Sequence, residues 1–149
     1  QMTDWLRSLD VLIYMSGGEG YGLMPMEAMA CGTPVISGLH TGLLDYMTPD
    51  NCLPVPCDGL IEAPSYDYRF GYKAFMRDCD SAAVAEQLRW AYGNRKALAT
   101  LGKKAAADVA GMTWERAGVD ALAALKWVMD AEIVAPGCHG SPGPAWFRA

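Results

Sequence analysis

A strand-like run, a glycine-rich turn and a helix-like segment follow one another near the start of this 149-residue chain. Residues 11–15 are apolar and rich in strand-forming side chains, which is typical of a strand buried on both faces. Residues 16–22 contain four glycines, so the backbone can turn sharply and leave its N–H groups accessible. Pro25 stands where a helix commonly begins and Gly32 is typical of a helix end, so we expect a helix over residues 25–31.

Val35 and Ile36 predict a second strand directly after this helix. A strand, a helix and a second strand in this order form the repeating unit of an open parallel sheet. We therefore expect an α/β fold. Ligands of such sheets bind beyond the carboxyl ends of the strands, which is where the glycine-rich turn would lie.

Two carboxylates accompany the glycine-rich turn: Glu19 lies within it, and Glu27 lies in the first turn of the predicted helix. A glycine-rich turn that enters a helix offers unpaired N–H groups and a positive dipole end, which together favour a phosphate. The carboxylates would repel a phosphate but accept hydrogen bonds from hydroxyl groups, so the pattern indicates a nucleotide or a sugar phosphate. The alternative is that Glu27 only favours the helix N-terminus, worth about 0.3–1 kcal/mol, and that Glu19 is a solvated loop charge.

The segment from Glu19 to Glu27, followed by Ala-Met-Ala-Cys-Gly-Thr-Pro-Val-Ile, resembles the E-x7-E signature of retaining GT-B glycosyltransferases, of the type called glycosyl transferases group 1. Residues 2–12 resemble the helix and strand that precede this signature, and residues 41–45 resemble the G-G-x-x-E turn that follows it. Residues 80–128 resemble the closing helices of the family. The resemblance implies a Rossmann-like parallel sheet with flanking helices, as in part of the C-terminal domain of a GT-B fold.

The resemblance also implies a role for each residue of the signature. Glu19 would be the catalytic carboxylate, binding hydroxyls of the transferred sugar and stabilising charge at its anomeric carbon. Glu27 would accept hydrogen bonds from the two ribose hydroxyls of the donor. The backbone N–H groups that would hold the sugar and the diphosphate belong to Gly20, Tyr21, Gly22, Leu23 and Met24. The donor would be a nucleotide sugar such as a UDP-, GDP- or ADP-sugar, the acceptor is unidentified, and neither a metal ion nor a cofactor is expected.

The resemblance places the helix that precedes the signature strand, within residues 2–12, midway through the C-terminal domain of a GT-B enzyme. It implies that residues 1–130 are a partial nucleotide-sugar-binding domain, in a fragment or truncated gene that lacks the N-terminal GT-B domain. Between Arg7 and Arg69 there is no Arg or Lys, so the basic residues that the family places against the diphosphate would be missing. Two alternatives stay open: a non-catalytic nucleotide-sugar-binding module, and an interaction domain that kept the fold.

The later part of the chain divides into three stretches. Residues 58–79 depart from the family as an aromatic insertion, in which aromatic and polar residues alternate over residues 66–72 and predict an extra strand or hairpin arm. Its aromatic face would pack on its own domain or, alternatively, serve as an acceptor or partner surface. From Asp80 onward, apolar residues at helical spacing predict three helices, the first of them capped by Asp80 or Ser81. Residues 131–149 are rich in proline and glycine and are expected to be irregular.

Charge and cysteine usage exclude several classes of protein. The net charge of −5 with no basic stretch argues against a nucleic-acid partner, and no apolar run is long enough to predict a transmembrane segment. The five cysteines form no C-x-x-C pair and leave an odd one, which favours free thiols in a reducing cytoplasm, with the intact enzyme either free or peripheral at the membrane. Cys138 and His139 predict a loop rather than a metal site, and His40 is expected to be a solvated loop side chain.

Overall fold

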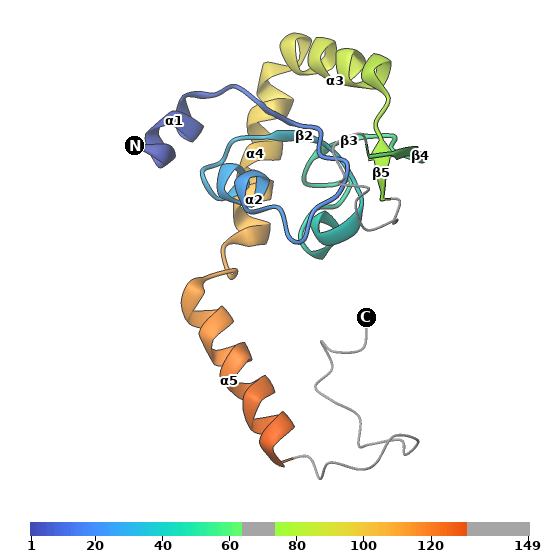
Figure 1. Cartoon of the computed structure of the whole chain (residues 1–149). Coiled ribbons are helices and arrows are strands. Elements are labelled where there is room, and N and C mark those ends of the chain that lie inside the picture. Colours follow the sequence, from blue (N-terminus) through green and yellow to red (C-terminus); the bar gives the residue numbers. More distant parts are fainter. Residues whose placement is uncertain (64–73, 131–149) are drawn as a thin grey trace. The chain divides into compact units, whose positions relative to one another are not determined.

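The computed structural model describes residues 1–63 and 74–130 (Figure 1). The chain falls into two compact units, residues 1–110 and residues 111–149, and each is described by itself. All of the predicted site residues lie in the first unit. The aromatic run at residues 66–72 and the Pro/Gly-rich stretch at residues 131–149 lie outside the described residues.

A three-stranded parallel sheet forms the centre of the first unit. Its strands, in the order in which they pair, are β1 (Leu12–Tyr14), β2 (Val35–Gly38) and β3 (Leu53–Val55). The central strand β2 is fully buried because its successive side chains enter two different core clusters: Val35 packs in one and Ile36 in the other. The α/β class with a Rossmann-like parallel sheet and flanking helices is therefore confirmed.

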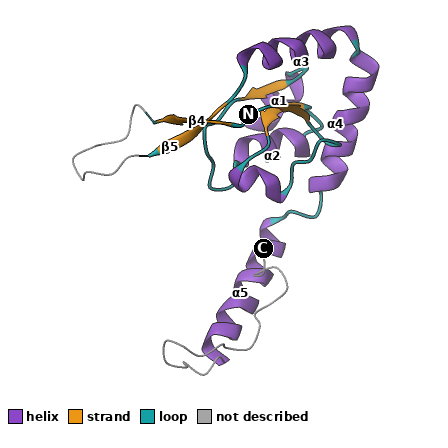
Figure 2. Cartoon of the chain, turned by 90° about the vertical axis from the view of Figure 1, so that its right-hand side faces the viewer, coloured by secondary structure: helices purple, strands orange, loops and turns teal. Residues whose placement is uncertain are grey.

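Helices contribute to both clusters beside the strands, and Figure 2 shows how they are arranged around the sheet. They are α1 (Met2–Ser8), α2 (Leu23–Ala30), the 3-10 helix η1 (Thr41–Asp45), α3 (Ser81–Gly93) and α4 (Arg95–Val109). α1 and α2 pack in the cluster of Val35, α3 packs in the cluster of Ile36, and α4 contributes to both. α4 also lies close to the end of α2, because a Cβ on Gly102 would meet the carbonyl oxygen of Gly32.

The helix starts test two local predictions. The carboxylate of Asp80 accepts the N–H of Ala82 at 2.8 Å, so Asp80 caps α3 as its sequence indicates. The prediction that α2 begins at Pro25 is wrong, because the helix already begins at Leu23. Gly22 adopts a left-handed conformation (φ 81°) that a side chain rarely takes, and this ends the loop two residues earlier than proline alone suggests.

The insertion forms an antiparallel hairpin of β4 (Gly59–Glu62) and β5 (Phe75–Asp78). These arms flank the aromatic run, which is where the extra strand itself is predicted. The hairpin is attached to the rest of the unit at two points. Its base is closed by a disulfide between Cys57 and Cys79, and the N–H of Arg77 donates to the carbonyl of Gly17 at 2.7 Å. The hairpin is thereby held against the glycine-rich turn.

The second unit is described through one helix, α5 (Trp114–Asp130). The hydroxyl of Thr113 accepts the N–H of Arg116 at 3.2 Å and caps the start of this helix. With α3 and α4, it completes the three helices predicted after residue 80. In the part of the chain that the structure describes, no helix has the length and apolar character needed to cross a membrane.

Candidate functional site

The glycine-rich turn belongs to a loop, residues 15–22, that joins the carboxyl end of β1 to the start of α2 and is called the glycine loop below. The segments that follow β2 and β3 lie at the same edge of the sheet, because the carboxyl ends of parallel strands coincide. Tyr46 fixes the end of the loop: its hydroxyl donates to the carbonyl of Gly22 at 2.5 Å, and its ring centre lies 5.4 Å from that of Tyr21. Burial raises the pKa of Tyr46 well above its usual value, so it acts as a neutral donor.

The backbone of Glu19 is held by the start of η1. Its N–H donates to Oγ1 of Thr41 at 3.0 Å, and its carbonyl accepts the N–H of Gly42 at 3.2 Å. The glycine loop and the start of η1 approach so closely that a Cβ on Gly42 would overlap the carbonyl of Gly20. Thr41 is left-handed (φ 49°), a conformation that favours glycine, which explains why the family turn has glycine at this position. Its hydroxyl supplies the hydrogen bond that a glycine could not make.

The side chain of Glu19 is kept as a carboxylate. The hydroxyl of Tyr14, the last residue of β1, donates to its Oε1 at 2.5 Å. This hydrogen bond, and next a hydrogen bond from Ser16, lower the pKa of Glu19. Burial, followed by the bond to Glu19, raises the pKa of Tyr14 to about 12. At neutral pH a neutral phenol therefore orients an ionised, half-buried carboxylate, which can accept further hydrogen bonds from a ligand.

Glu27 lies beyond the first turn of α2 and its side chain is exposed. The prediction that places it in the first turn is wrong, because the helix begins at Leu23 rather than at Pro25. The helix dipole acts within the first turn, so the simple alternative of a favourable helix-end charge loses its main support. Glu27 makes no side-chain hydrogen bond or ion pair with residues 1–63 and 74–130, and its carboxylate is open to a ligand.

The residues predicted to bind a donor through their N–H groups form the end of the loop and the start of α2. Gly20, Tyr21, Leu23 and Met24 are exposed, whereas Gly22 is buried beneath them. No side chain caps this helix start. The N–H groups of its first turn have no carbonyl partner within the helix, so they are disposed to meet an anionic group.

Arg77 is a feature that sequence reasoning missed. Its backbone N–H is hydrogen-bonded to Gly17 of the glycine loop, and the residue lines a cavity of about 500 Å³ together with His40, Thr41 and Asp58. A glycine at position 17 allows this contact, because a Cβ there would meet Met76 at 2.7 Å. No signal in the sequence near the signature predicts a cation there, since Arg77 lies fifty residues after Glu27 in the chain.

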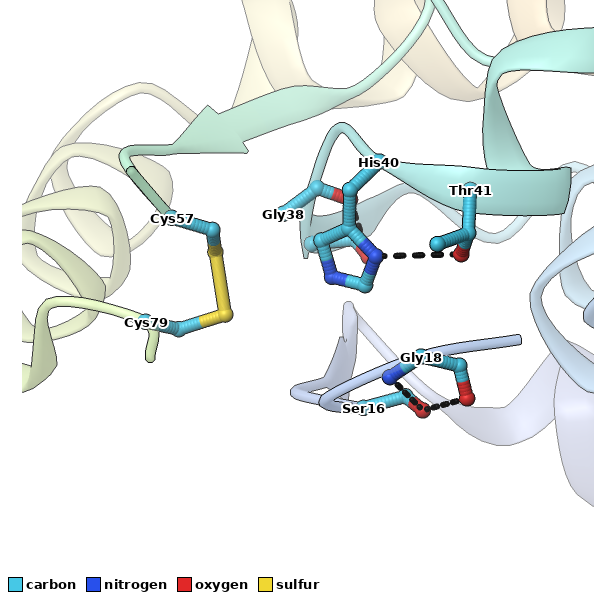
Figure 3. Close-up of a disulfide and its surroundings, with 8 residues drawn as sticks. Ser16, Gly18, Gly38, His40, Thr41, Cys57 and Cys79 are labelled. Atoms are coloured by element: carbon cyan, nitrogen blue, oxygen red, sulfur yellow. Dashed lines mark hydrogen bonds between the residues drawn. A yellow bond between two sulfur atoms is a disulfide. The ribbon is translucent and has the colours of Figure 1, made fainter. Parts of the chain in front are cut away.

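Two expectations about other side chains are wrong. His40 is buried (4% exposed), not solvated, because it lies beside Thr41 and the sulfur atoms of Cys57 and Cys79. Cys57 and Cys79 form a disulfide beside it, as Figure 3 shows, whereas all five cysteines were expected to be free. A separation of 22 residues matches no cysteine motif from which this disulfide could be predicted, and the hairpin brings the two cysteines together. Cysteine usage no longer favours a reducing compartment for these two residues.

Comparisons with known proteins point to one group. Residues 1–68 match the sequence model of the family described as glycosyl transferases group 1. Similar curated proteins include the D-inositol 3-phosphate glycosyltransferase of Arthrobacter sp. (strain FB24), 30% identical over 137 residues, which are 89% of this chain and 27% of that protein. The protein of the same name from Kribbella flavida is 30% identical over 129 residues, 84% of this chain and 25% of its own length. The chain thus spans about a quarter of these relatives.

Proposed function

We propose that this chain, whose residues 1–68 match the glycosyl transferases group 1 family, forms part of the donor site of a retaining glycosyltransferase with the GT-B fold. The donor is a nucleotide sugar. The observation that carries this proposal is the ionised carboxylate of Glu19 in a glycine loop at the carboxyl edge of a parallel sheet. Tyr14 binds this carboxylate, and Thr41 binds the backbone N–H of the same residue.

Glu19 is the catalytic residue of this proposal. An acceptor-only carboxylate binds hydroxyl groups of the transferred sugar, and its negative charge stabilises the positive charge that develops at the anomeric carbon as the nucleoside diphosphate departs. Tyr14 and Thr41 are positioning residues, because one orients the carboxylate and the other fixes the backbone that carries it. Their contacts are already made without a ligand, so little reorganisation is needed when the donor binds.

The nucleotide is bound at the start of α2. The exposed carboxylate of Glu27 accepts hydrogen bonds from the two ribose hydroxyls, and the N–H groups from Gly20 to Met24 face the sugar and the diphosphate. Arg77 supplies a cation for the diphosphate, since its backbone N–H is hydrogen-bonded to the glycine loop and the residue lines the adjacent cavity. In this proposal the transfer step uses these groups and no metal ion.

The acceptor is proposed from the relatives alone. Because similar proteins are named D-inositol 3-phosphate glycosyltransferases, D-inositol 3-phosphate is the acceptor to test first. A second candidate function is a nucleotide-sugar-binding module without transferase activity. The observation in its favour is that this chain corresponds to about a quarter of those proteins.

Calorimetric titration of the chain with UDP-, GDP- and ADP-sugars tests the donor site. We expect one nucleotide class to bind, and we expect Glu27→Ala to weaken it by about 1.5–3 kcal/mol, at least tenfold in Kd, because a charged acceptor is lost. Glu86→Ala, which removes an exposed carboxylate from α3, is the matched control and should bind as the unchanged chain does. Equal affinity of the Glu27 and Glu86 variants would contradict the role of Glu27.

Transfer is measured separately, by mass spectrometry of a mixture of the bound donor and D-inositol 3-phosphate. A glycosylated product that Glu19→Gln abolishes supports the transferase, and the anomeric configuration of that product by NMR tests retention. Donor binding without any product supports the binding module instead. Absence of binding by every nucleotide sugar would overturn both functions and leave an interaction domain.

A further inference from the structure

A second cluster of reactive side chains lies beside the glycine loop, and none of its members belongs to the proposed transfer step. It consists of His40, which follows β2, Cys57, which follows β3, and Cys79, which follows β5. The potential ligand atoms of these three residues all lie within 4.8 Å of one another. The topology brings them together from three separate parts of the sequence, as Figure 3 shows.

The imidazole of His40 has one nitrogen in use and one that is not. Nδ1 lies 3.2 Å from Oγ1 of Thr41, whereas Nε2 is buried without a hydrogen-bond partner in the part of the chain that the structure describes. The residue as a whole is 4% exposed, and Nε2 itself is buried, so bulk water hardly reaches this atom. In Figure 3 the free nitrogen faces the sulfur atoms of Cys57 and Cys79. Buried polar atoms are rarely left unpaired, so Nε2 indicates a missing partner.

The hydrogen-bond pattern around His40 suits a metal ligand. When Nδ1–H donates to Thr41, Nε2 carries a lone pair that points at the two sulfurs. Metal-bound histidines commonly use one nitrogen in this way to fix the ring while the other coordinates. Two thiolates and one imidazole are ligands typical of Zn²⁺, whereas Mg²⁺ and Ca²⁺ bind oxygen ligands.

We propose that the reduced chain binds Zn²⁺ through His40 Nε2 and the thiolates of Cys57 and Cys79, and that this metal and the disulfide are alternative cross-links at the base of the β4–β5 hairpin. A dithiol reductant breaks the S–S bond by supplying two electrons and two protons, and becomes a disulfide itself. Zn²⁺ then replaces the two thiol protons, which are released to solvent. This site lies beyond the proposed function, because no step of sugar transfer uses it.

The geometry fits such a site after a small movement. Tetrahedral zinc with bonds of about 2.3 Å to sulfur and about 2.0 Å to nitrogen holds its ligand atoms about 3.5–3.8 Å apart. The two sulfurs, bonded to each other in the oxidised chain, move apart once the disulfide is reduced. The imidazole nitrogen lies at most 4.8 Å from either sulfur and needs to move only slightly. Gly38 makes room at the cluster, because a Cβ on it would overlap Sγ of Cys57. The cavity of about 500 Å³ that His40 and Cys57 help to line gives the ion an entry path and leaves the fourth position to water.

Either cross-link would fix the hairpin next to the proposed donor site. Cys79 follows directly after β5, whose Arg77 is bonded to Gly17 of the glycine loop. On the other side of the cluster, His40 and Glu19 share the hydroxyl of Thr41. The metal therefore has a positional role in this proposal, and its site is adjacent to the catalytic residue rather than part of it.

The test is a Co²⁺ titration of the full chain after reduction with a phosphine, followed by Zn²⁺ competition. Co²⁺ bound by thiolates shows charge-transfer absorption and tetrahedral ligand-field bands, which report the ligands directly. The protein used for this titration carries the substitutions Cys138→Ser and His139→Ala, so that the cysteine and histidine outside the described residues cannot supply ligands. We expect one ion per reduced chain, displacement by Zn²⁺, and at least tenfold weaker binding by the oxidised chain.

Single variants identify the ligands. Cys57→Ser and His40→Ala should each weaken Zn²⁺ at least tenfold, whereas Cys31→Ser, which removes a free thiol at the end of α2, should bind as before. If one of these variants fails to fold, X-ray absorption of the zinc-loaded protein with His40, Cys57 and Cys79 unchanged identifies the ligands instead. We expect the zinc ion to have two sulfur neighbours and one imidazole neighbour. Absence of thiolate charge transfer in the reduced chain, or a zinc shell of oxygen atoms only, would overturn the proposal.

Discussion

Replacing Tyr14 with phenylalanine is the sharpest perturbation of the candidate site, because it removes one oxygen atom and keeps the ring. That oxygen donates to Oε1 of Glu19 at 2.5 Å. A hydrogen bond to a charged group is worth about 1.5–3 kcal/mol, and because Glu19 is half-buried and water competes for it, we expect a loss of about 1 kcal/mol at pH 7. For a unit of this size that corresponds to a Tm lower by about 4 °C.

The pH dependence separates this bond from simple packing. The pKa of Glu19 is lowered in the folded chain, so its contribution to stability is present above the unfolded value of 4.5 and is lost as the pH falls through the folded value. The pKa of Tyr14 is raised from 10.0 to about 12, so its contribution is present below pH 10 and is lost as the pH rises toward 12. The free energies of unfolding of the unchanged protein and of Tyr14→Phe should therefore differ most near neutral pH.

Urea unfolding at pH 7 and at pH 3.5 measures these differences. Tyr92→Phe is the matched control, since Tyr92 is 82% exposed on α3 and its hydroxyl should contribute nothing at either pH. Tyr14→Phe should lower the free energy of unfolding at pH 7 and lower it less at pH 3.5, where part of the contribution of the ionised Glu19 is lost. An equal loss at both values, or no loss at pH 7, would refute the interpretation that Tyr14 stabilises an ionised Glu19.

Two further predictions concern the contact between the glycine loop and η1. Thr41→Ala should cost about 1 kcal/mol in urea unfolding and weaken donor binding, because the N–H of Glu19 loses its acceptor, whereas Thr41→Ser should restore both; equal behaviour of the two variants would contradict this role. Gly42→Ala should lose about 1–3 kcal/mol in thermal unfolding, because its Cβ would overlap the carbonyl of Gly20. Gly93→Ala, where no atom lies within 4 Å of the new Cβ, is the control and should not show this loss.

Most of the secondary structure around the site was predictable because its signals are local. Val35 and Ile36 form the central strand as expected, and Asp80 caps the helix that follows it in the chain. The start of α2 was misjudged by two residues, because its position depends on Gly22 in a left-handed conformation under the hydroxyl of Tyr46. Proline at position 25 is compatible with a helix that begins earlier, since its missing N–H is still within the first turn.

Order along the chain was enough to predict where the two glutamates lie in the βαβ unit. Glu19 lies in the loop after β1 and Glu27 on the helix behind it, because hydrophobic periodicity and glycine content specify strand, loop and helix locally. Their proposed roles still depend on the resemblance and on the binding experiments. The identity of the residues around them could not be obtained in the same way.

Contacts between distant segments were decided by the assembled sheet. Thr41 binds Glu19 across 22 residues, and Cys57 meets Cys79 across the same separation, beside a buried His40. The carboxyl ends of parallel strands meet at one edge, so loops that are remote in sequence become neighbours there, and Arg77 arrives on a hairpin from further along the chain. A local pattern specifies which element a residue belongs to, whereas its partners and burial follow from the order and register in which the strands pair.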